Sequence, residues 1–144
     1  MATLVTGSAS GGETGLVDAA RENLGEIDGR IADGDYRQAI IAYEMNNQVF
    51  RLAQRRAVEE SDGGTPGPVT SIFKVYGSEL EQDYYDLLTR IRGIHGLGVA
   101  DEPFTEGELE TTRQWLFYRA ASIYSGSNEI QRNIIAKRVL GLPD

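Results

Sequence analysis

The chain has no cysteine and only one histidine among its 144 residues. Without cysteine there is neither a disulfide framework nor thiol chemistry, and one histidine cannot build the usual Cys/His zinc site, so no metal site is expected. Long apolar runs are missing too, and no membrane-spanning helix is predicted. The first residues lack the charged start and apolar core of a signal peptide, which favours a cytoplasmic protein.

Positive charge is also scarce. Fourteen Lys and Arg residues face 22 Asp and Glu residues, which gives a formal net charge of -8. A nucleic-acid-binding protein needs a basic surface to neutralise phosphates, so nucleic acid is not expected as a partner. A nucleotide cofactor stays compatible with this charge, because one pyrophosphate needs only local donors such as a helix N-terminus.

Helical periodicity is what the sequence does contain, whereas runs of alternating β-branched residues are missing. The pattern predicts an all-α fold, an antiparallel bundle of four to five helices with short connections. Residues 1–15 are rich in Gly and Ser and are expected to form a flexible leader. Residues 16–144 are expected to form one helical bundle domain. The predicted helices are Leu16–Ile27, Tyr36–Glu59, Val69–Ile91, Thr105–Ile123 and Ser127–Leu140.

Capping residues support these boundaries. Asp33 or Asp35 can cap the second helix, and Thr105 with Glu108 fits a capping box for the fourth. Ser127 is a good N-cap for the last helix. Asp28-Gly29 indicates a turn, with Ile31 as an apolar anchor after it, and residues 61–68 are expected to form a loop. Gly77, in the middle of the third helix, suggests close approach of another helix.

The apolar stripe of the second helix is wide. Ile41, Met45 and Leu52 share one side with Val49 close by, and other apolar residues extend the stripe. A stripe this wide indicates burial against more than one neighbour. The third helix also carries a full apolar stripe, and a small bundle cannot cover both stripes alone. We therefore predict self-association that buries some of Ile40, Phe50, Tyr76 or Tyr84 between chains.

The closing segment reads Ile123-Tyr-Ser-Gly-Ser-Asn-Glu-Ile-Gln-Arg-Asn-Ile-Ile-Ala-Lys-Arg-Val-Leu-Gly-Leu-Pro143. It resembles the end of the acyl-CoA dehydrogenases, FAD-dependent flavoproteins that carry out α,β-dehydrogenation of acyl-CoA thioesters. The segment Pro68–Leu80 is similar to the opening of that family's third bundle helix. The resemblance implies that the chain is the C-terminal helical domain of such an enzyme. It also implies that acyl-CoA is the substrate of the complete enzyme and that the domain contributes contacts to a homo- or hetero-oligomer.

Ser125 stands where many members of this family carry the glutamate that removes the α-proton. A serine hydroxyl is far too weakly basic for this step without a partner, so no catalytic residue is assigned. Two explanations stay open. The base can lie on the first bundle helix, which is short here, or the protein can be the non-catalytic partner of a paired subunit. The isolated chain is not expected to turn over.

Four residues are candidate FAD contacts by this resemblance: Gly126, Ser127, Glu129 and Gly93. Gly126 comes just before the predicted last helix, and Ser127 and Glu129 lie at its start. This pattern by itself is typical of an ordinary capped helix start. Gly93 lies in a turn that resembles one in which the family's backbone approaches the adenine of a neighbouring subunit. Here Ile94 and His95 replace a glycine and an aromatic residue, and the family's Arg-x-x-Phe-Gly signature is missing.

The remaining candidates have simpler interpretations. His95 is interpreted as a helix-end or surface residue rather than a catalyst. Glu44 could act as a base if it were buried, or could pair with Arg37 or Arg51. Arg55-Arg56 is expected to be a solvated face. The alternative function is a stand-alone helical interaction or assembly module without catalysis.

Overall fold

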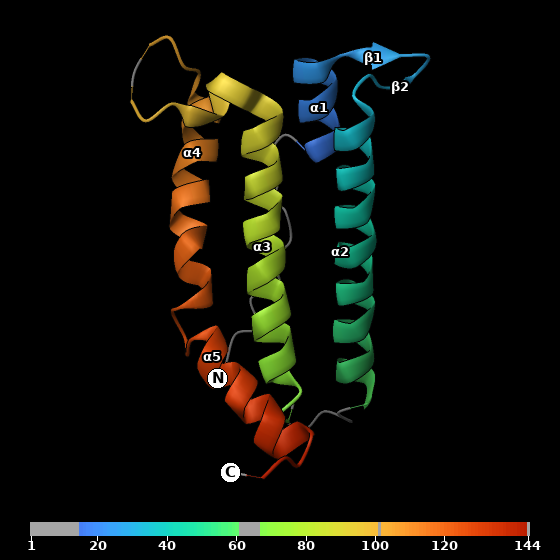
Figure 1. Ribbon diagram of the computed structural model, residues 1–144, viewed down its shortest axis with the longest axis vertical. Coiled ribbons are helices and arrows are strands. Elements are labelled where there is room, and N and C mark those ends of the chain that lie inside the picture. Colours follow the sequence, from blue (N-terminus) through green and yellow to red (C-terminus); the bar gives the residue numbers. More distant parts are fainter. Residues whose placement is uncertain (1–14, 61–66, 101, 144) are drawn as a thin grey trace.

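The computed structural model describes residues 15–60, 67–100 and 102–143, and these residues form helices joined by short connections and one small hairpin (Figure 1). The all-α prediction is confirmed. The predicted leader, except residue 15, and most of the predicted loop at residues 61–68 lie outside the described residues. The elements are α1 (Leu16–Leu24), β1 (Glu26–Ile27), β2 (Arg30–Ile31), α2 (Gly34–Glu60), α3 (Thr70–Arg92), η1 (Gly93–Leu97), α4 (Glu106–Tyr118), η2 (Arg119–Ser122), α5 (Asn128–Ile134) and η3 (Ile135–Val139).

The long helix α3 lies in the middle of the molecule, between α2 and α4 (Figure 1). α1 packs on the C-terminal part of α3, and α5 packs on its N-terminal part at the opposite end. The apolar core lies where α1, α2, α3 and the second strand meet. Its buried residues are Leu16, Ala19, Ala20, Ile31, Ile40, Tyr85, Leu87, Leu88 and Ile91. The small side chains of α1 let this short helix lie close against α3.

The first helix ends earlier than predicted. It stops at Leu24 because Gly25 takes a left-handed φ of 77°, and the expected helical residues Glu26 and Ile27 form a strand instead. This strand pairs antiparallel with Arg30–Ile31 across the turn at Asp28 and Gly29, whose φ values are 52° and 73°. Positive φ at both central residues is the geometry that a tight hairpin prefers. The predicted turn is therefore confirmed, and Ile31 is the buried anchor.

The other helix starts follow the predicted caps. Asp33 Oδ1 accepts hydrogen bonds from the backbone N–H groups of Asp35 and Tyr36 at 2.9 and 3.0 Å. Thr105 and Glu108 form the predicted capping box of α4. α2 and α3 match their predicted bounds to within two residues.

The ends of the last two helices change their winding. α4 tightens into the 3-10 turn η2 after Tyr118, and α5 continues as the π-helical turn η3 before Gly141 ends it with a φ of 66°. Both predicted helices therefore reach nearly their expected ends, but not as regular α-helix throughout.

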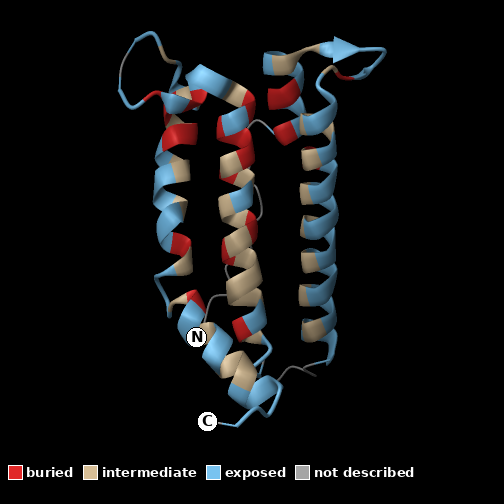
Figure 2. Ribbon diagram, viewed as in Figure 1, coloured by how far each residue is buried: buried red, intermediate tan, exposed pale blue. Residues whose placement is uncertain are grey.

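The two sides of α2 have different surroundings. Ile40 is 3% exposed and packs inside the chain, so the expectation that it lies between chains is wrong. Phe50, Tyr76 and Tyr84 are half-buried, and each of these rings contacts other rings of the same chain. Their place in an interface stays a prediction. The side of α2 that faces away from α3 is exposed (Figure 2). Large apolar residues of α2 that are more than half exposed include Ile41, Met45, Val49 and Leu52.

Gly77 lies in a tight contact between α3 and a side chain of α2, in agreement with the predicted close approach of another helix. A Cβ atom built at Gly77 would lie 3.0 Å from Phe50 Cζ, tighter than an ordinary contact. Phe50 also packs edge-on against Phe73, which limits its freedom to move.

We expect Gly77→Val to lower the free energy of unfolding by about 1–3 kcal/mol, because two added methyl groups overpack this contact. Gly107→Val is the matched control, since the nearest atom to a Cβ there is 3.8 Å away, on the flexible Arg92 side chain. The control should change stability by less than about 0.5 kcal/mol. Urea unfolding followed by circular dichroism measures both, and equal midpoints would contradict the close approach.

Candidate functional site

The turn between η2 and α5 contains the residues that the sequence singled out. Ser125 has a φ of 57° and Gly126 a φ of 88°, so two consecutive residues are left-handed. The positive φ favours glycine at Gly126, and a Cβ atom there would lie 2.7 Å from Gln131 Nε2, so a larger residue would displace the flexible end of that side chain. Gln131 Nε2 also donates a hydrogen bond of 3.5 Å to the Ser125 carbonyl. The turn is therefore supported by a side chain of the helix that follows it.

Ser127 is the N-cap of α5, as predicted. Its hydroxyl oxygen accepts a hydrogen bond from the backbone N–H of Ile130 at 3.5 Å. Hydrogen bonds from its own backbone N–H and from the Ser127 hydroxyl hold the pKa of Glu129 below its ordinary value. Glu129 is exposed and carries its negative charge at the positive end of a helix, where charge and dipole agree.

A buried polar network fastens this turn to α3. Asn128 is 3% exposed, and its side-chain oxygen accepts a hydrogen bond of 2.9 Å from Lys74 Nζ. The Lys74 ammonium also donates to the carbonyl of Ala121 at 2.9 Å, and Ser78 Oγ lies 3.0 Å from Asn128 Nδ2. One lysine thus joins α3 to both sides of the turn.

The electrostatics of Lys74 follow from its position. Burial lowers the pKa of its ammonium group, and the negative charge of Glu129 opposes that shift. The sequence analysis missed this network. Lys74 and Ser78 are four residues apart and therefore share a helix face, but their partner Asn128 is 50 residues beyond Ser78.

Further contacts brace the same junction. Gln82 Nε2 donates to the Tyr118 carbonyl at 3.0 Å, and Arg132 pairs with Glu79. Asp86 accepts hydrogen bonds from both Trp115 and Arg119. These contacts run from α3 to α4, η2 and α5, so α3 controls where the turn lies.

Glu81 is a second residue that the sequence analysis missed. It is half-buried on α3, and burial raises the pKa of its carboxyl group. Its negative charge also adds to the effect of burial in raising the pKa of Tyr124, the residue before Ser125. A half-buried carboxyl group therefore lies within electrostatic range of the turn, although nothing in the local pattern of α3 distinguishes Glu81 from its neighbours.

Gly93 lies at the other end of α3 from this turn (Figure 1). It follows Ser78 by 15 residues, which is about 22 Å along a helix. Its φ is 57°, and no atom lies within 4 Å of the position of an added Cβ. One copy of the chain therefore does not bring Gly93 together with Gly126, Ser127 and Glu129.

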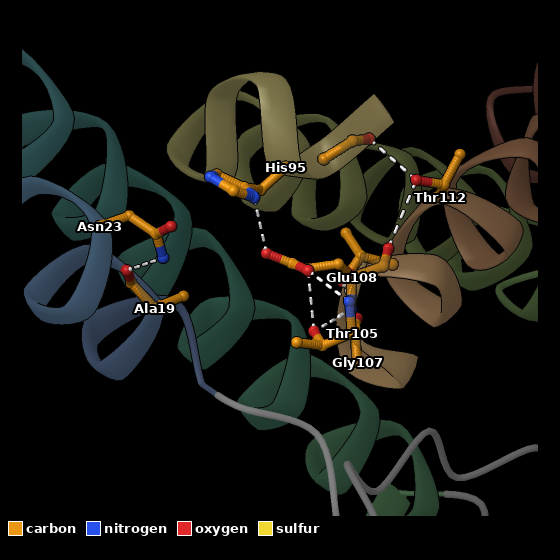
Figure 3. A network of polar contacts seen from close by, with 9 residues as sticks. Ala19, Asn23, His95, Thr105, Gly107, Glu108 and Thr112 are labelled. Carbon is orange, nitrogen blue, oxygen red and sulfur yellow. Dashed lines mark hydrogen bonds and ion pairs between the residues drawn. The ribbon is translucent and has the colours of Figure 1, made fainter. Parts of the chain in front are cut away.

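His95, next to Gly93, contacts the start of α4. Its Nδ1 lies 2.9 Å from Glu108 Oε1, while the other oxygen of Glu108 closes the capping box with Thr105 (Figure 3). Thr112 Oγ1 donates to the Gly96 carbonyl at 2.9 Å. These contacts agree with the interpretation of His95 as a helix-end residue.

The other candidate residues are exposed. Glu44 faces solvent, so the hypothesis of a buried base at this position is wrong. Arg55 and Arg56 form part of an exposed face, and Arg56 pairs with Glu60 at 2.7 Å. Among the described residues, no group of three or more His, Cys, Asp or Glu side chains converges on a point that could hold a metal ion. In the same part of the chain, each helix is too short or too polar to cross a membrane.

Several exposed large apolar residues lie close to the turn along the chain, on α4, in the turn and on α5: Leu116, Phe117, Ile123, Tyr124 and Ile130. The ring centroids of Phe117 and Tyr124 lie 6.5 Å apart. Exposed apolar side chains that gather on a surface favour binding of a ligand or of another part of a protein.

The chain is similar in sequence to acyl-CoA dehydrogenases. A model described as acyl-CoA dehydrogenase, C-terminal domain, matches residues 16–140. The acyl-CoA dehydrogenase IpdE1 of Mycobacterium tuberculosis is 34% identical over 128 residues, which are 89% of this chain and 31% of that protein. IpdE1 of Mycolicibacterium smegmatis is 39% identical over 87 residues, 60% of this chain and 21% of that protein. The chain thus spans less than a third of these relatives.

A solved structure agrees in fold. The crystal structure of the ChsE4-ChsE5 complex from Mycobacterium tuberculosis matches with a TM-score of 0.72 and 22% identity. The match covers 90% of this chain and 34% of the solved chain.

The Lys74 network generates a stability prediction. Asn128→Leu removes one of the two acceptors of Lys74 and the buried partner of Ser78. We expect the free energy of unfolding to fall by about 2 kcal/mol, because the buried Ser78 hydroxyl and the partly buried Lys74 ammonium group each lose a hydrogen bond. Asn133→Leu, an exposed asparagine of the same helix, should change it by less than about 0.5 kcal/mol. Thermal unfolding followed by circular dichroism compares them, and equal losses would refute a special role for Asn128.

Proposed function

Because the chain belongs to the acyl-CoA dehydrogenase family, as its C-terminal domain, we propose that it works within an FAD-dependent protein that carries out α,β-dehydrogenation of acyl-CoA thioesters. The observation that carries the proposal is the family match over residues 16–140, which includes the whole bundle and the turn at Ser125. The chain covers about a third of its relatives' length, so the flavin and substrate sites need further protein.

The turn at Gly126 is the proposed FAD contact. Gly126 has no side chain and is exposed, so a flat ring or a phosphate can approach its backbone closely. Ser127 and Glu129 offer a hydroxyl and a carboxylate at the start of α5, and the exposed apolar residues Ile123, Tyr124 and Ile130 are near them in the chain. These features fit a cofactor with both apolar rings and hydrogen-bonding groups. Bound flavin supplies the hydride acceptor.

Gly93 is proposed to contact the cofactor of a different subunit. About 22 Å of helix separates it from the Ser78 end of α3, where the Gly126 turn is fastened. A single cofactor contacted by both regions therefore draws on two protein copies or on two subunits. This arrangement makes association part of the proposed function.

The alternative, an assembly module without catalysis, has one observation in its favour. Ser125 stands where a carboxylate is expected for proton abstraction, and its hydroxyl is not a sufficient base. The two functions differ in flavin: the first requires it and the second does not.

Flavin retention tests the first function. In the full-length protein we expect Glu129→Gln to weaken FAD binding about tenfold, because a charged hydrogen-bond acceptor is lost. Glu22→Gln, an exposed glutamate of α1, is the control and should bind FAD normally. Flavin absorbance after dialysis at graded FAD concentrations measures the affinity. A colourless full-length protein that never takes up FAD would contradict the proposal.

Ser125→Glu tests the missing base. If the carboxylate is the only chemical defect, acyl-CoA-dependent flavin bleaching in the full-length protein should accelerate by roughly two to four orders of magnitude. Ser125 is already left-handed, so the new residue inherits rather than creates that backbone strain. Unmodified protein that already bleaches flavin without a partner subunit would place the base elsewhere. No bleaching before or after the change would support a non-catalytic partner.

A further inference from the structure

Lys74 contacts both sides of the turn at Ser125. Its Nζ atom lies 2.9 Å from the carbonyl oxygen of Ala121, which comes before the turn, and 2.9 Å from Oδ1 of Asn128, which comes after it. An ammonium group has three N–H donors, and two of those of Lys74 are used in these contacts. A single side chain of α3 therefore connects the two segments that the turn separates.

The backbone hydrogen bonds that flank the turn each stay on one side of it. Before the turn, the N–H group of Tyr124 donates to the carbonyl four residues earlier at 3.0 Å, and after it the N–H group of Gln131 donates to the Ser127 carbonyl at 2.9 Å. The side chain of Gln131 reaches back to the Ser125 carbonyl, but at 3.5 Å this hydrogen bond is long. The contacts of Lys74 are shorter, and they connect both sides of the turn to α3.

The turn needs such support because its backbone is in an unfavourable region. Ser125 has a φ of 57°, and a left-handed conformation is costly for a residue with a Cβ atom. Strained conformations of this kind persist only where surrounding contacts hold them, and they often occur at functional sites. Ser125 and Gly126 are both exposed, so their own burial does not hold them. Asn128 does provide a fixed point, since it is 3% exposed and also bonds to Ser78.

Lys74 also acts on the charge of Glu129, one of the proposed cofactor contacts. Hydrogen bonds from the backbone N–H of Glu129 and from the Ser127 hydroxyl lower the pKa of this carboxyl group, and the positive charges of Arg132 and Lys74 lower it further. Burial lowers the pKa of the Lys74 ammonium group, and the negative charge of Glu129 opposes that shift. The two charges therefore attract each other across the junction of α3 and α5.

We propose that Lys74 is a positioning residue of the cofactor site, because its ammonium group holds the Ser125 turn in the shape that presents the proposed FAD contacts. Those contacts are Gly126, Ser127 and Glu129. This inference deepens the proposed function and rests on it. Lys74 is half-buried and directs two donors toward its own chain, so it acts through the turn rather than by contact with the cofactor. If the turn has this shape for only part of the time, its affinity for a ligand falls by the same fraction.

Cofactor affinity in the full-length protein tests this role. Lys74→Met keeps the length of the side chain and removes its donors, so we expect FAD binding to weaken about tenfold to a hundredfold. Gly77→Val is the matched control, because it lowers stability at the contact with Phe50 rather than at the turn. It should bind FAD to within about twofold of the unmodified protein. Titration of the apoprotein with FAD, followed by flavin fluorescence, measures the dissociation constants. Unchanged affinity in Lys74→Met, or equal losses in the two variants, would overturn the inference.

Asn128→Leu keeps the test decisive if Lys74→Met loses its helices, which far-ultraviolet circular dichroism detects. This substitution removes one of the two acceptors of Lys74 and leaves the other, so FAD affinity should fall about threefold to tenfold. A folded Asn128→Leu variant that binds FAD as tightly as the unmodified protein would count against a positioning role for Lys74.

The spectrum of bound flavin separates positioning from stability. At FAD concentrations that saturate each variant, the visible circular dichroism of the flavin reports the groups around its ring. Lys74→Met should change this spectrum, whereas Gly77→Val should leave it as in the unmodified protein. An unchanged spectrum in Lys74→Met would mean that the turn keeps its shape without the ammonium group, and the inference would be wrong.

Hydrogen exchange in the full-length apoprotein tests the support of the turn without FAD. The backbone N–H groups of Tyr124 and Gln131, which donate on the two sides of the turn, should exchange about tenfold faster in Lys74→Met. Unchanged exchange would overturn the role of Lys74 whether or not the protein binds FAD. Faster exchange in a protein that never takes up FAD would support the role of Lys74 in the turn and contradict the proposed function, so the two failures are distinguishable.

Discussion

Burial of α3 on several sides is the constraint that positions the other elements. α2, α4, α1 and α5 all pack against it, and its buried residues lie on more than one face. A helix with so wide a buried surface is stable only with neighbours around it. The family resemblance implies cofactor contacts for two segments, and these lie at opposite ends of α3. Gly93 follows its last residue, and the turn at Ser125 is fastened to its first half.

The contacts that hold the turn at Ser125 against α3 are polar, so they fix the orientation of the turn. The ammonium group of Lys74 is partly removed from water, so it needs the acceptors that Ala121 and Asn128 provide. Those two residues stand on either side of Ser125 and Gly126, which therefore keep their left-handed shape between fixed points. An apolar contact could bring α5 to α3, but it would not fix the turn in this orientation.

Two sets of exposed large apolar residues lie on the described part of the chain. One set belongs to α4, the turn and α5, and the other consists of Ile41, Met45, Val49 and Leu52 on α2. They lie on different elements at opposite edges of the layer (Figure 1). The relatives are about three times as long as this chain. Exposed apolar patches of this kind favour contact with another surface.

The sequence by itself determined the helices, their caps and the recognisable closing segment. Capping by Asp33, Thr105 and Ser127 acts within three or four residues, so local pattern is sufficient to predict it. Only the tertiary structure decided that Glu26 and Ile27 leave the helix, since the hairpin depends on Ile31 reaching the core. It also decided which apolar face of α2 is inside and which acceptors Lys74 finds 47 and 54 residues away. Backbone dihedral preferences and the hydrogen bonds of helix caps are set by neighbours in sequence. Burial of a helix face depends instead on which distant helix packs against it.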